Sequence, residues 1–363
     1  MSRVLFIAGG GTGGHLMPAL ALAQTVSELD SSVEPVLIGS RRGVEREILP
    51  TRDFRYYLLP SEPVYRRQWW RNGRWPLVLF RLRSRLAALF AEERPVAVLG
   101  TGGYASAPVV WYGQRLGLPT ALQEQNAIPG LATKWLSPKA RHLYLGLPES
   151  REYLRPGRNT LVFDTGNPVA RPEFSIREAA RARFGLDSET STVLVAGGSQ
   201  GSLAINRTVA AWLDRGGGQG LNVLWITGRT THPEFVHYHR PPGVQVFDFL
   251  DPMAEAYAVA HVAVCRAGAV TVAELCAWGL PSILIPLPTA AGNHQTRNAE
   301  AMARSGAAWF LPQADLTPER FGARVDSLVK DPEARIEMSV AANERGRPTA
   351  SVDIARELLT LLR

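Results

Sequence analysis

A histidine stands in a glycine-rich stretch near the start of the chain, where it could act as a base. Residues 8–18 read Ala-Gly-Gly-Gly-Thr-Gly-Gly-His-Leu-Met-Pro and follow the apolar run 4–7. Glycines let backbone N–H groups approach an anion, and the N-terminus of a following helix adds positive charge. Histidine has an ordinary pKa of about 6.5, so His15 could take a proton from a substrate hydroxyl. We predict a phosphate-binding strand, turn and helix, with the helix over 18–28.

The same glycines also match a dinucleotide-binding pattern, Gly-x-Gly-x-x-Gly at positions 9, 11 and 14. The acidic residue that grips a ribose in that motif is missing, because Ser40-Arg41-Arg42 follows the second apolar run. Arginines there could bind a 2′-phosphate, so an NADP-dependent oxidoreductase stays open as an alternative. A further alternative is that residues 9–15 form an ordinary tight turn with a half-buried histidine and no bound ligand.

Two further polar stretches follow apolar runs in the first half. Gly102 and Gly103 lie in a second strand-to-glycine turn, and the residues 123–126, Gln-Glu-Gln-Asn, offer carboxylate and amide groups suited to sugar hydroxyls. Loops that follow the strands of a parallel sheet share one rim. We therefore expect the two glycine turns to lie together, where they could cradle a diphosphate, with a rim loop over 123–126 beside them.

The second half repeats this arrangement. An apolar run over 192–196 is followed by Gly-Gly-Ser-Gln-Gly at 197–201 and by a helical pattern over 203–213. A second anion site is expected near Ala269, where small residues precede a predicted helix start. Its candidate groups for a diphosphate and a ribose are Arg266, the N–H groups of Ala269, Val270 and Thr271, and the carboxylate of Glu274.

A last polar group follows the apolar run that ends at Pro286. Gln295 and Asn298 stand at a predicted helix start, so their amides could reach one small polar ligand. His232, His237 and His239 lack a matching ligand set, so we predict no metal site there. The sequence also has no Asp-x-Asp motif to hold a metal and a diphosphate.

Short apolar strands alternate with helical stretches along the whole chain of 363 residues, which predicts an α/β protein with two doubly wound parallel sheets. Asn-Pro at 167–168 favours a turn, so we place the linker at 166–169. The predicted domains are 1–165 and 166–349, with an amphipathic helix 350–363 packed back on the first. The predicted strands are 3–8, 36–39, 55–59, 96–100, 120–122, 142–145, 161–163, 192–196, 223–226, 244–247, 262–265 and 282–285.

Positive charge is concentrated in the first half, where residues 1–163 hold 21 Lys and Arg against 12 Asp and Glu. No acidic residue occurs from Pro63 to Ala91. A helix from Trp75 would bury an apolar stripe of residues at i+3 and i+4 spacing, namely Trp75, Leu79, Leu82, Leu86 and Leu89. The aromatic and basic residues of this segment that lie outside the stripe resemble an interfacial membrane patch, because indoles favour the headgroup zone and arginines pair with anionic lipids. This patch consists of Arg66, Arg67, Trp69, Trp70, Arg71 and Phe80.

Composition argues against a disulfide-rich secreted protein and against a membrane-spanning protein. Two cysteines, Cys265 and Cys276, cannot form a disulfide framework and fit a reducing compartment. We see no secretory signal and no run of about 18 apolar residues that could span a membrane. We therefore expect a peripheral protein on the cytoplasmic face of the cell membrane, with no nucleic-acid partner.

Taken in order, the motifs resemble the MurG family of N-acetylglucosaminyltransferases, which convert lipid I to lipid II in peptidoglycan synthesis. The resemblance covers nearly the whole chain and implies the GT-B fold, in which two Rossmann-like domains face a cleft. The matching stretches are 10–15, 102–104, 124–126, 166–169, 197–201, 266–274 and 294–299.

The resemblance also implies roles for single residues. His15 would be the base, and the first domain would bind the lipid-linked acceptor through Gly11, Gly102, Gly103, Tyr104, Glu124 and Asn126. The second domain would bind UDP-GlcNAc, with Ser199 at the diphosphate, Glu274 at the ribose and Leu250 by the uracil. The complete set of implied donor contacts is Thr12, Gly13, Gly14, Asn126, Ser199, Leu250, Arg266, Ala269, Val270, Thr271, Glu274, Gln295 and Asn298.

The implied reaction is a single displacement with inversion, without a cofactor or a metal. The implied partners are UDP-GlcNAc, undecaprenyl-linked lipid I, an anionic membrane surface, and cell-wall and division proteins. Two alternatives remain beside the NADP-dependent oxidoreductase. A UDP-GlcNAc 2-epimerase shares the fold, and a non-catalytic adaptor could use the same basic and aromatic patch.

Overall fold

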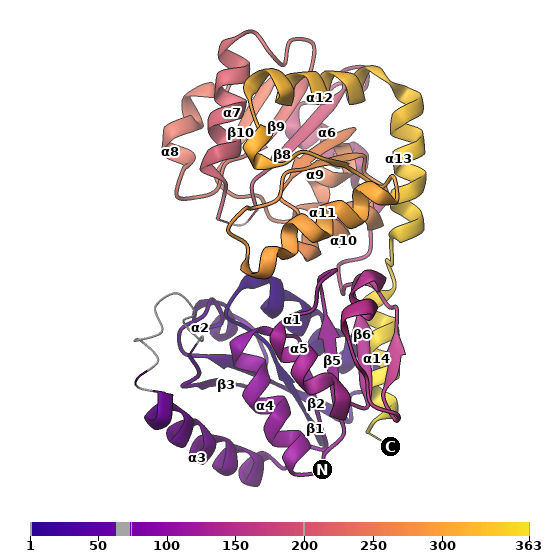
Figure 1. Cartoon of the computed structure of the whole chain (residues 1–363). Coiled ribbons are helices and arrows are strands. Elements are labelled where there is room, and N and C mark those ends of the chain that lie inside the picture. Colours follow the sequence, from indigo (N-terminus) through magenta and orange to yellow (C-terminus); the bar gives the residue numbers. More distant parts are fainter. Residues whose placement is uncertain (1, 63–72, 74, 199, 363) are drawn as a thin grey trace. The chain divides into compact units, whose positions relative to one another are not determined.

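The chain divides into two compact units in the computed structural model, which describes residues 2–62, 73, 75–198 and 200–362. The first unit comprises residues 1–170 and 349–363, and the second comprises 171–348. Each unit is built on one parallel sheet with helices on both faces (Figure 1). The predicted α/β class with two doubly wound sheets is confirmed.

The first sheet has seven parallel strands in the order β3-β2-β1-β4-β5-β6-β7. The order reverses between β1 and β4, which are hydrogen-bonded neighbours. The strands are β1 (Arg3–Ala8), β2 (Val33–Ser40), β3 (Tyr56–Leu59), β4 (Ala97–Gly100), β5 (Thr120–Glu124), β6 (His142–Leu145) and β7 (Leu161–Phe163). The helices are α1 (Gly13–Leu29), α2 (Glu45–Ile48), α3 (Trp75–Glu93), α4 (Gly103–Arg115), α5 (Leu131–Leu136) and α14 (Ala350–Thr360).

Alternate residues of β1 pack into two separate hydrophobic cores, because successive side chains of a strand point to opposite faces of the sheet. Leu5 and Ile7 pack with buried residues of α1 and α14. Phe6 packs on the other face with α3 and α4, and its ring meets that of Phe90 edge-on at 5.0 Å. Both faces of the sheet are therefore covered, as a parallel sheet requires.

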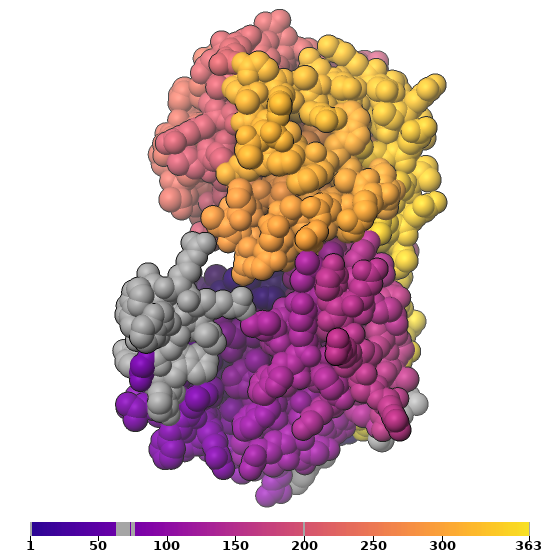
Figure 2. All heavy atoms as spheres, viewed as in Figure 1, coloured from indigo at the N-terminus to yellow at the C-terminus, as the bar shows by residue number. Residues whose placement is uncertain are grey.

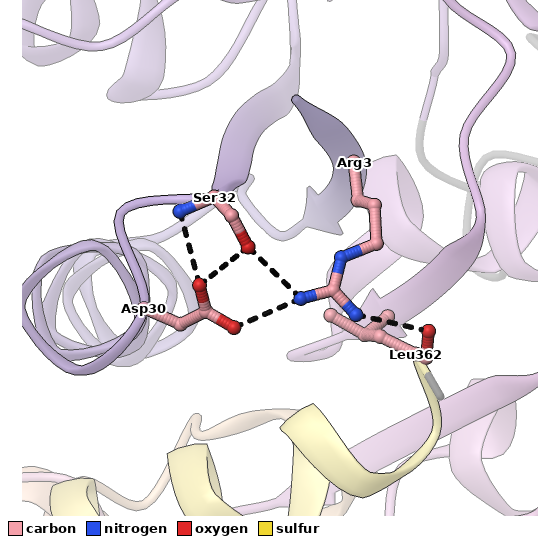
Figure 3. A network of polar contacts seen from close by, with 4 residues as sticks. All are labelled: Arg3, Asp30, Ser32 and Leu362. Atoms are coloured by element: carbon pink, nitrogen blue, oxygen red, sulfur yellow. Dashed lines mark hydrogen bonds and ion pairs between the residues drawn. The ribbon is translucent and has the colours of Figure 1, made fainter. Parts of the chain in front are cut away.

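The end of the chain is tied to its beginning. α14 packs on α1, and Ile354 and Leu358 are fully buried against it. Figure 3 shows the polar part of this contact, in which the Arg3 guanidinium donates to the carbonyl of Leu362 at 3.2 Å and to the carboxylate of Asp30 at 2.9 Å. Hydrogen bonds from Ser32, and then the charge of Arg3, lower the pKa of Asp30.

The second sheet has six parallel strands in the order β10-β9-β8-β11-β12-β13, which repeats the pattern of the first. Its core contains the fully buried Trp225 and Phe321. The strands are β8 (Thr192–Ala196), β9 (Asn222–Ile226), β10 (Val244–Phe247), β11 (Val262–Cys265), β12 (Ser282–Leu284) and β13 (Trp309–Phe310). The helices are α6 (Arg177–Phe184), α7 (Leu203–Asp214), α8 (His232–Phe235), α9 (Ala254–Val259), α10 (Ala269–Ala277), α11 (His294–Arg304), α12 (Pro318–Lys330) and α13 (Pro332–Arg345).

Several predicted boundaries differ from the structure. The residues 166–169, where the linker was placed, are buried within the first unit, and the division follows Ala170. The short β13 was not predicted, since two residues carry no periodicity. Leu79, expected in the buried stripe of α3, is 50% exposed, whereas Leu82 and Leu86 are buried as predicted.

Candidate functional site

The first glycine turn connects β1 to the N-terminus of α1. Thr12 is extended at the N-cap, and the helix begins at Gly13, five residues before the predicted start at Pro18. Two glycines disfavour a helix in isolation, but Leu16, Ala19 and Leu20 are buried in the core and override that preference. Thr12, Gly13 and Gly14 therefore lie where a 17-residue helix directs its first N–H groups, a position that favours an anion.

The second glycine turn packs directly on the first. A Cβ atom at Gly103 would lie 2.0 Å from the carbonyl oxygen of Gly10, and one at Gly102 would lie 2.7 Å from Nδ1 of His15. The ring of Tyr104 lies against Gly11 in the same way. The expectation that the two turns lie together is confirmed, because β1 and β4 are neighbours at the point where the strand order reverses.

His15 lies in the first turn of α1 and is half-buried. Its Nδ1 atom is 3.1 Å from the carbonyl oxygen of Thr101 and 3.1 Å from Oε1 of Gln125. The hydroxyl of Thr101 donates to the backbone carbonyl of His15 at 2.8 Å. The imidazole is thus held by residues of the second turn and of β5 as well as by its own helix.

The stretch 123–126 is not the rim loop that was expected, because Gln123 and Glu124 are the last residues of β5. Glu124 is buried and accepts from Thr133 Oγ1 at 2.6 Å, from the N–H of Gly130 at 3.0 Å and from the N–H of Asn126 at 3.1 Å. Its carboxylate therefore fixes the loop that carries Asn126. An acceptor contact of Glu124 or Asn126 remains a prediction.

One buried carboxylate beneath the first turn was missed in the sequence. Glu45 is fully buried and accepts from the N–H of Gly11 at 2.9 and 3.0 Å and from that of Ser40 at 2.8 Å. Its side chain fills the space where a Cβ atom of Gly10 or Gly43 would stand. The N–H of Gly11 therefore points at Glu45, and the turn owes its shape to a residue 34 positions later in the chain. No local pattern signals this contact.

In the second unit the glycine turn 197–201 lies between β8 and α7, and its Ser199 lies outside the described residues. Ser202 caps α7 by accepting from the N–H of Ile205 at 3.4 Å. Arg266, expected to face a diphosphate, is 7% exposed and donates to Ser202 Oγ at 2.6 Å and to the carbonyls of Ile285 and Pro286 at 3.1 and 3.0 Å.

Arg266 also donates to Gln313 Oε1, at 2.6 Å. All four of these acceptors are neutral. Burial lowers the pKa of the guanidinium to about 10, so it is charged at neutral pH. Its first role is to join its own loop, after β11, to the loops that follow β8, β12 and β13. Its charge has no carboxylate partner among the residues that the structure describes, and it therefore favours an anion nearby.

α10 begins at Ala269, as predicted, so Ala269, Val270 and Thr271 form its first turn. Glu274 follows within the same helix and accepts from the hydroxyl of Tyr257 at 2.9 Å. Burial raises the pKa of the Glu274 carboxyl, and the hydrogen bond from Tyr257 opposes this shift. Burial, followed by the charge of Glu274, raises the pKa of Tyr257, so the phenol keeps its proton. Sequence reasoning missed Tyr257, which lies on α9.

The remaining candidates of the second unit differ in their exposure. Asn298 is fully buried and donates to the carbonyl of Ala267 at 3.1 Å, so its amide braces the 266–268 turn instead of lying at the surface. Gln295 accepts from the N–H of Leu287 at 2.9 Å through its Oε1 atom. Leu250 is buried, whereas the adjacent Phe249 is 41% exposed under the guanidinium of Arg229. Ligand contacts of these residues remain predictions.

Each unit thus gathers groups suited to an anion where its strand order reverses. The first adds a histidine fixed at Nδ1, and the second adds a carboxylate held by a tyrosine. Among the described residues, no three His, Cys, Asp or Glu side chains cluster as metal ligands. The groups present can hold phosphates and hydroxyls and can move one proton.

Known proteins resemble this chain over nearly its whole length. Residues 5–145 match the model of the glycosyltransferase family 28 N-terminal domain, and residues 192–354 match that of the family 28 C-terminal domain. A protein of Prosthecochloris aestuarii named UDP-N-acetylglucosamine--N-acetylmuramyl-(pentapeptide) pyrophosphoryl-undecaprenol N-acetylglucosamine transferase is 36% identical over 365 residues. The alignment covers 99% of each chain.

Solved structures share the fold. The crystal structure of Acinetobacter baumannii MurG superposes with a TM-score of 0.77 at 24% identity and covers 99% of both chains. A UDP-GlcNAc 2-epimerase from Neisseria meningitidis, bound to UDP-GlcNAc, superposes with a TM-score of 0.66 at 13% identity, covering 99% of this chain and all of that one. At these identities the two structures establish the GT-B fold and nothing finer.

Proposed function

Since the chain belongs to the MurG family within glycosyltransferase family 28, we propose that it transfers N-acetylglucosamine from UDP-GlcNAc to the 4-hydroxyl of N-acetylmuramic acid in undecaprenyl-diphosphate-linked lipid I, giving lipid II. The observation that carries this proposal is the full-length match at 36% identity to a transferase of that name. The epimerase likeness extends to the fold alone. The NADP-dependent oxidoreductase and the non-catalytic adaptor are set aside with family membership.

The second unit supplies the groups for the donor. Glu274 is placed to accept the ribose hydroxyls, because Tyr257 holds only one of its oxygens in the contacts described above. The N-terminus of α10 and the charge of Arg266 favour the diphosphate and the negative charge that grows as UDP departs. Gln295 and the loop braced by Asn298 are assigned to the sugar.

The first unit supplies the acceptor groups and the base. The 4-hydroxyl of the acceptor attacks the anomeric carbon while the bond from that carbon to the UDP oxygen breaks, which inverts the configuration. His15 takes the hydroxyl proton. The N-termini of α1 and α4 favour the acceptor diphosphate at the paired glycine turns, a role supported by their shared position beside His15.

Release of UDP tests this function directly. UDP should leave UDP-GlcNAc only when a lipid-diphosphate-linked N-acetylmuramyl acceptor is present. Acceptor-independent formation of a 2-epimer would favour the epimerase. Binding of UDP-GlcNAc without release, in the presence of well-dispersed acceptor, would contradict the acceptor assignment and leave the donor site standing.

Loss of the Tyr257 hydroxyl should weaken donor binding. In Tyr257→Phe the Glu274 carboxylate loses a hydrogen bond and a fixed orientation, which is worth about 1 kcal/mol, or about fivefold in affinity. We expect the KM for UDP-GlcNAc to rise by about that factor with little change in kcat. Tyr238→Phe is the matched control, because its hydroxyl bonds an exposed carboxylate, Asp214, in the same unit. An equal effect of both variants would contradict the assignment.

We also propose that α3 lies against an anionic membrane. Leu77, Leu79 and Phe80 are 64, 50 and 74% exposed near its start, and the exposed Arg81, Arg83 and Arg85 follow. The helix lies at the edge of its unit (Figures 1 and 2). The patch residues Arg66, Arg67, Trp69, Trp70 and Arg71 lie outside the described residues. The cytoplasmic location and the contacts with cell-wall and division proteins remain proposals.

No helix in the described part of the chain is long and apolar enough to cross a membrane. Binding through α3 is expected to depend on its exposed apolar and basic side chains. Phe80→Ser combined with Leu77→Ser should lower binding to phosphatidylglycerol vesicles by about a hundredfold or more, because each buried apolar side chain contributes about 1.5–3 kcal/mol. Vesicle flotation measures this.

The control for this prediction is Leu161→Ser, which changes an exposed leucine on β7 of the same unit. It should bind vesicles like the unaltered protein. High salt should weaken binding of all forms, because it screens the arginines. Unchanged flotation of the double variant would rule out this face of α3.

A further inference from the structure

The Nδ1 atom of His15 lies between two hydrogen-bond acceptors. One is the carbonyl oxygen of Thr101 and the other is Oε1 of Gln125, each at 3.1 Å. A backbone carbonyl can only accept a hydrogen bond. The contact with Thr101 therefore calls for a proton on Nδ1 whenever the imidazole is neutral.

The orientation of the Gln125 amide is also determined by its neighbours. Its Nε2 atom lies 2.6 Å from the carbonyl oxygen of Thr101 and 3.3 Å from that of Gln123. Only a donor can stand at those positions, so the nitrogen must face the two carbonyls. The oxygen must then face His15, where it accepts from Nδ1.

Two more buried amides hold Gln125 in this orientation. Gln125 Nε2 also donates to Oε1 of Gln123, and Gln123 Nε2 donates to Oδ1 of Asn167 at 2.9 Å. Asn167 Nδ2 returns to the backbone carbonyl of Gln125 at 3.0 Å. All three side chains are 1–2% exposed. Because each amide in the chain has one donor end and one acceptor end, reversing one of them would leave buried groups opposed.

We propose that Gln125 is a positioning residue that keeps His15 protonated at Nδ1 and leaves the lone pair on Nε2 for the acceptor hydroxyl. The catalytic part of this inference rests on the proposed function, in which His15 is the base. The hydrogen-bond part does not. Histidine can act through either nitrogen, and the partner of one nitrogen determines the role of the other.

The surrounding elements carry other titratable groups whose charge could act on the imidazole. In the described residues these are Glu45 beneath the first turn, Tyr104 at the start of α4 and Glu124 at the end of β5. None of them changes when Gln125 is replaced. A Gln125→Glu variant therefore isolates the effect of one added negative charge at the Nδ1 side of the ring.

Nitrogen-15 NMR of histidine-labelled protein tests the tautomer without substrate. The chain has seven histidines, and the His15→Gln spectrum identifies the signals of His15 by their loss. In neutral His15 we expect Nδ1 to be protonated and Nε2 to be unprotonated. In Gln125→Met the ratio of the two tautomers should shift by about fivefold toward Nε2–H, because one of two hydrogen bonds is lost. A predominant Nε2–H form in the unaltered protein would overturn the proposal.

The pH profile of kcat then tests the consequence. In Gln125→Glu a carboxylate favours the imidazolium, so the acid limb should move upward by about one to three pH units, with activity recovered at high pH. Gln114→Glu is the control, because Gln114 bonds Thr120 and Leu136 and should leave the limb in place. An equal loss of kcat at all pH values would contradict the proposal and show that Gln125 has only a structural role. Acceptor-dependent UDP release by the unaltered protein is measured separately. A failure of the proposed function can therefore be distinguished from a failure of this inference.

Discussion

His15→Ala should lower kcat for acceptor-dependent UDP release by about 10² to 10⁴, the usual contribution of a positioned general base. Binding of UDP-GlcNAc should persist, because the donor groups Glu274, Arg266 and the start of α10 belong to the second unit. Single-turnover kinetics with saturating donor measures the chemical step, and calorimetry with UDP-GlcNAc measures binding.

His237→Ala provides the control for this experiment. His237 is an exposed histidine of the second unit, so its loss removes the same ring without touching the glycine turns. It should match the unaltered protein in both measurements. A His15→Ala enzyme that retains a near-normal rate would remove His15 from the role of base. A variant that also loses donor binding would point to misfolding.

Gly103→Ala should cost about 10² in kcat/KM or more, although it adds a single methyl group. Its Cβ atom would stand 2.0 Å from the carbonyl oxygen of Gly10 and 3.1 Å from the His15 ring. The backbone oxygen cannot rotate away, so the two glycine turns must separate. A displacement of about 1 Å is enough to cost about 10² in rate at a preorganised site. Gly103 also has φ +79°, which disfavours any L side chain.

Gly117→Ala separates the clash from the backbone strain. Gly117 follows α4 with φ +77°, and a Cβ atom there would meet nothing within 4 Å. It should lose about 1 kcal/mol of unfolding free energy in urea titration and keep its activity. Gly103→Ala should be destabilised further and be much less active. Equal activity of the two variants would mean that the contact between the turns does not shape the site.

The predicted elements that match the structure are those whose signals are local. Apolar runs, glycine turns and helix starts lie within a few residues of one another, so β1, β8, α10 and the glycine turns could be located from sequence. Their alternation further indicated parallel sheets. The meeting of two glycine turns followed as well, because the carboxyl ends of neighbouring parallel strands share an edge.

The shapes of these turns depend on partners that are distant in the chain. Glu45 holds Gly11 from 34 residues away, Gln125 meets His15 across 110 residues, and Tyr257 holds Glu274 from another helix. Each of these side chains is ordinary in its local sequence context. Burial makes each one decisive, because a buried polar group must find a partner.

By itself the sequence determined the class of fold, the position of the glycine turns and the identity of the candidate base. These features depend on backbone propensity and on residue spacing, which are properties of short stretches of consecutive residues. Tertiary structure alone decided that Arg266 and Asn298 brace loops, and that Gln125, held by Gln123 and Asn167, presents its amide oxygen to His15. A hydrogen bond has a direction that spacing does not carry, so only the folded chain reveals which atom of His15 faces the protein.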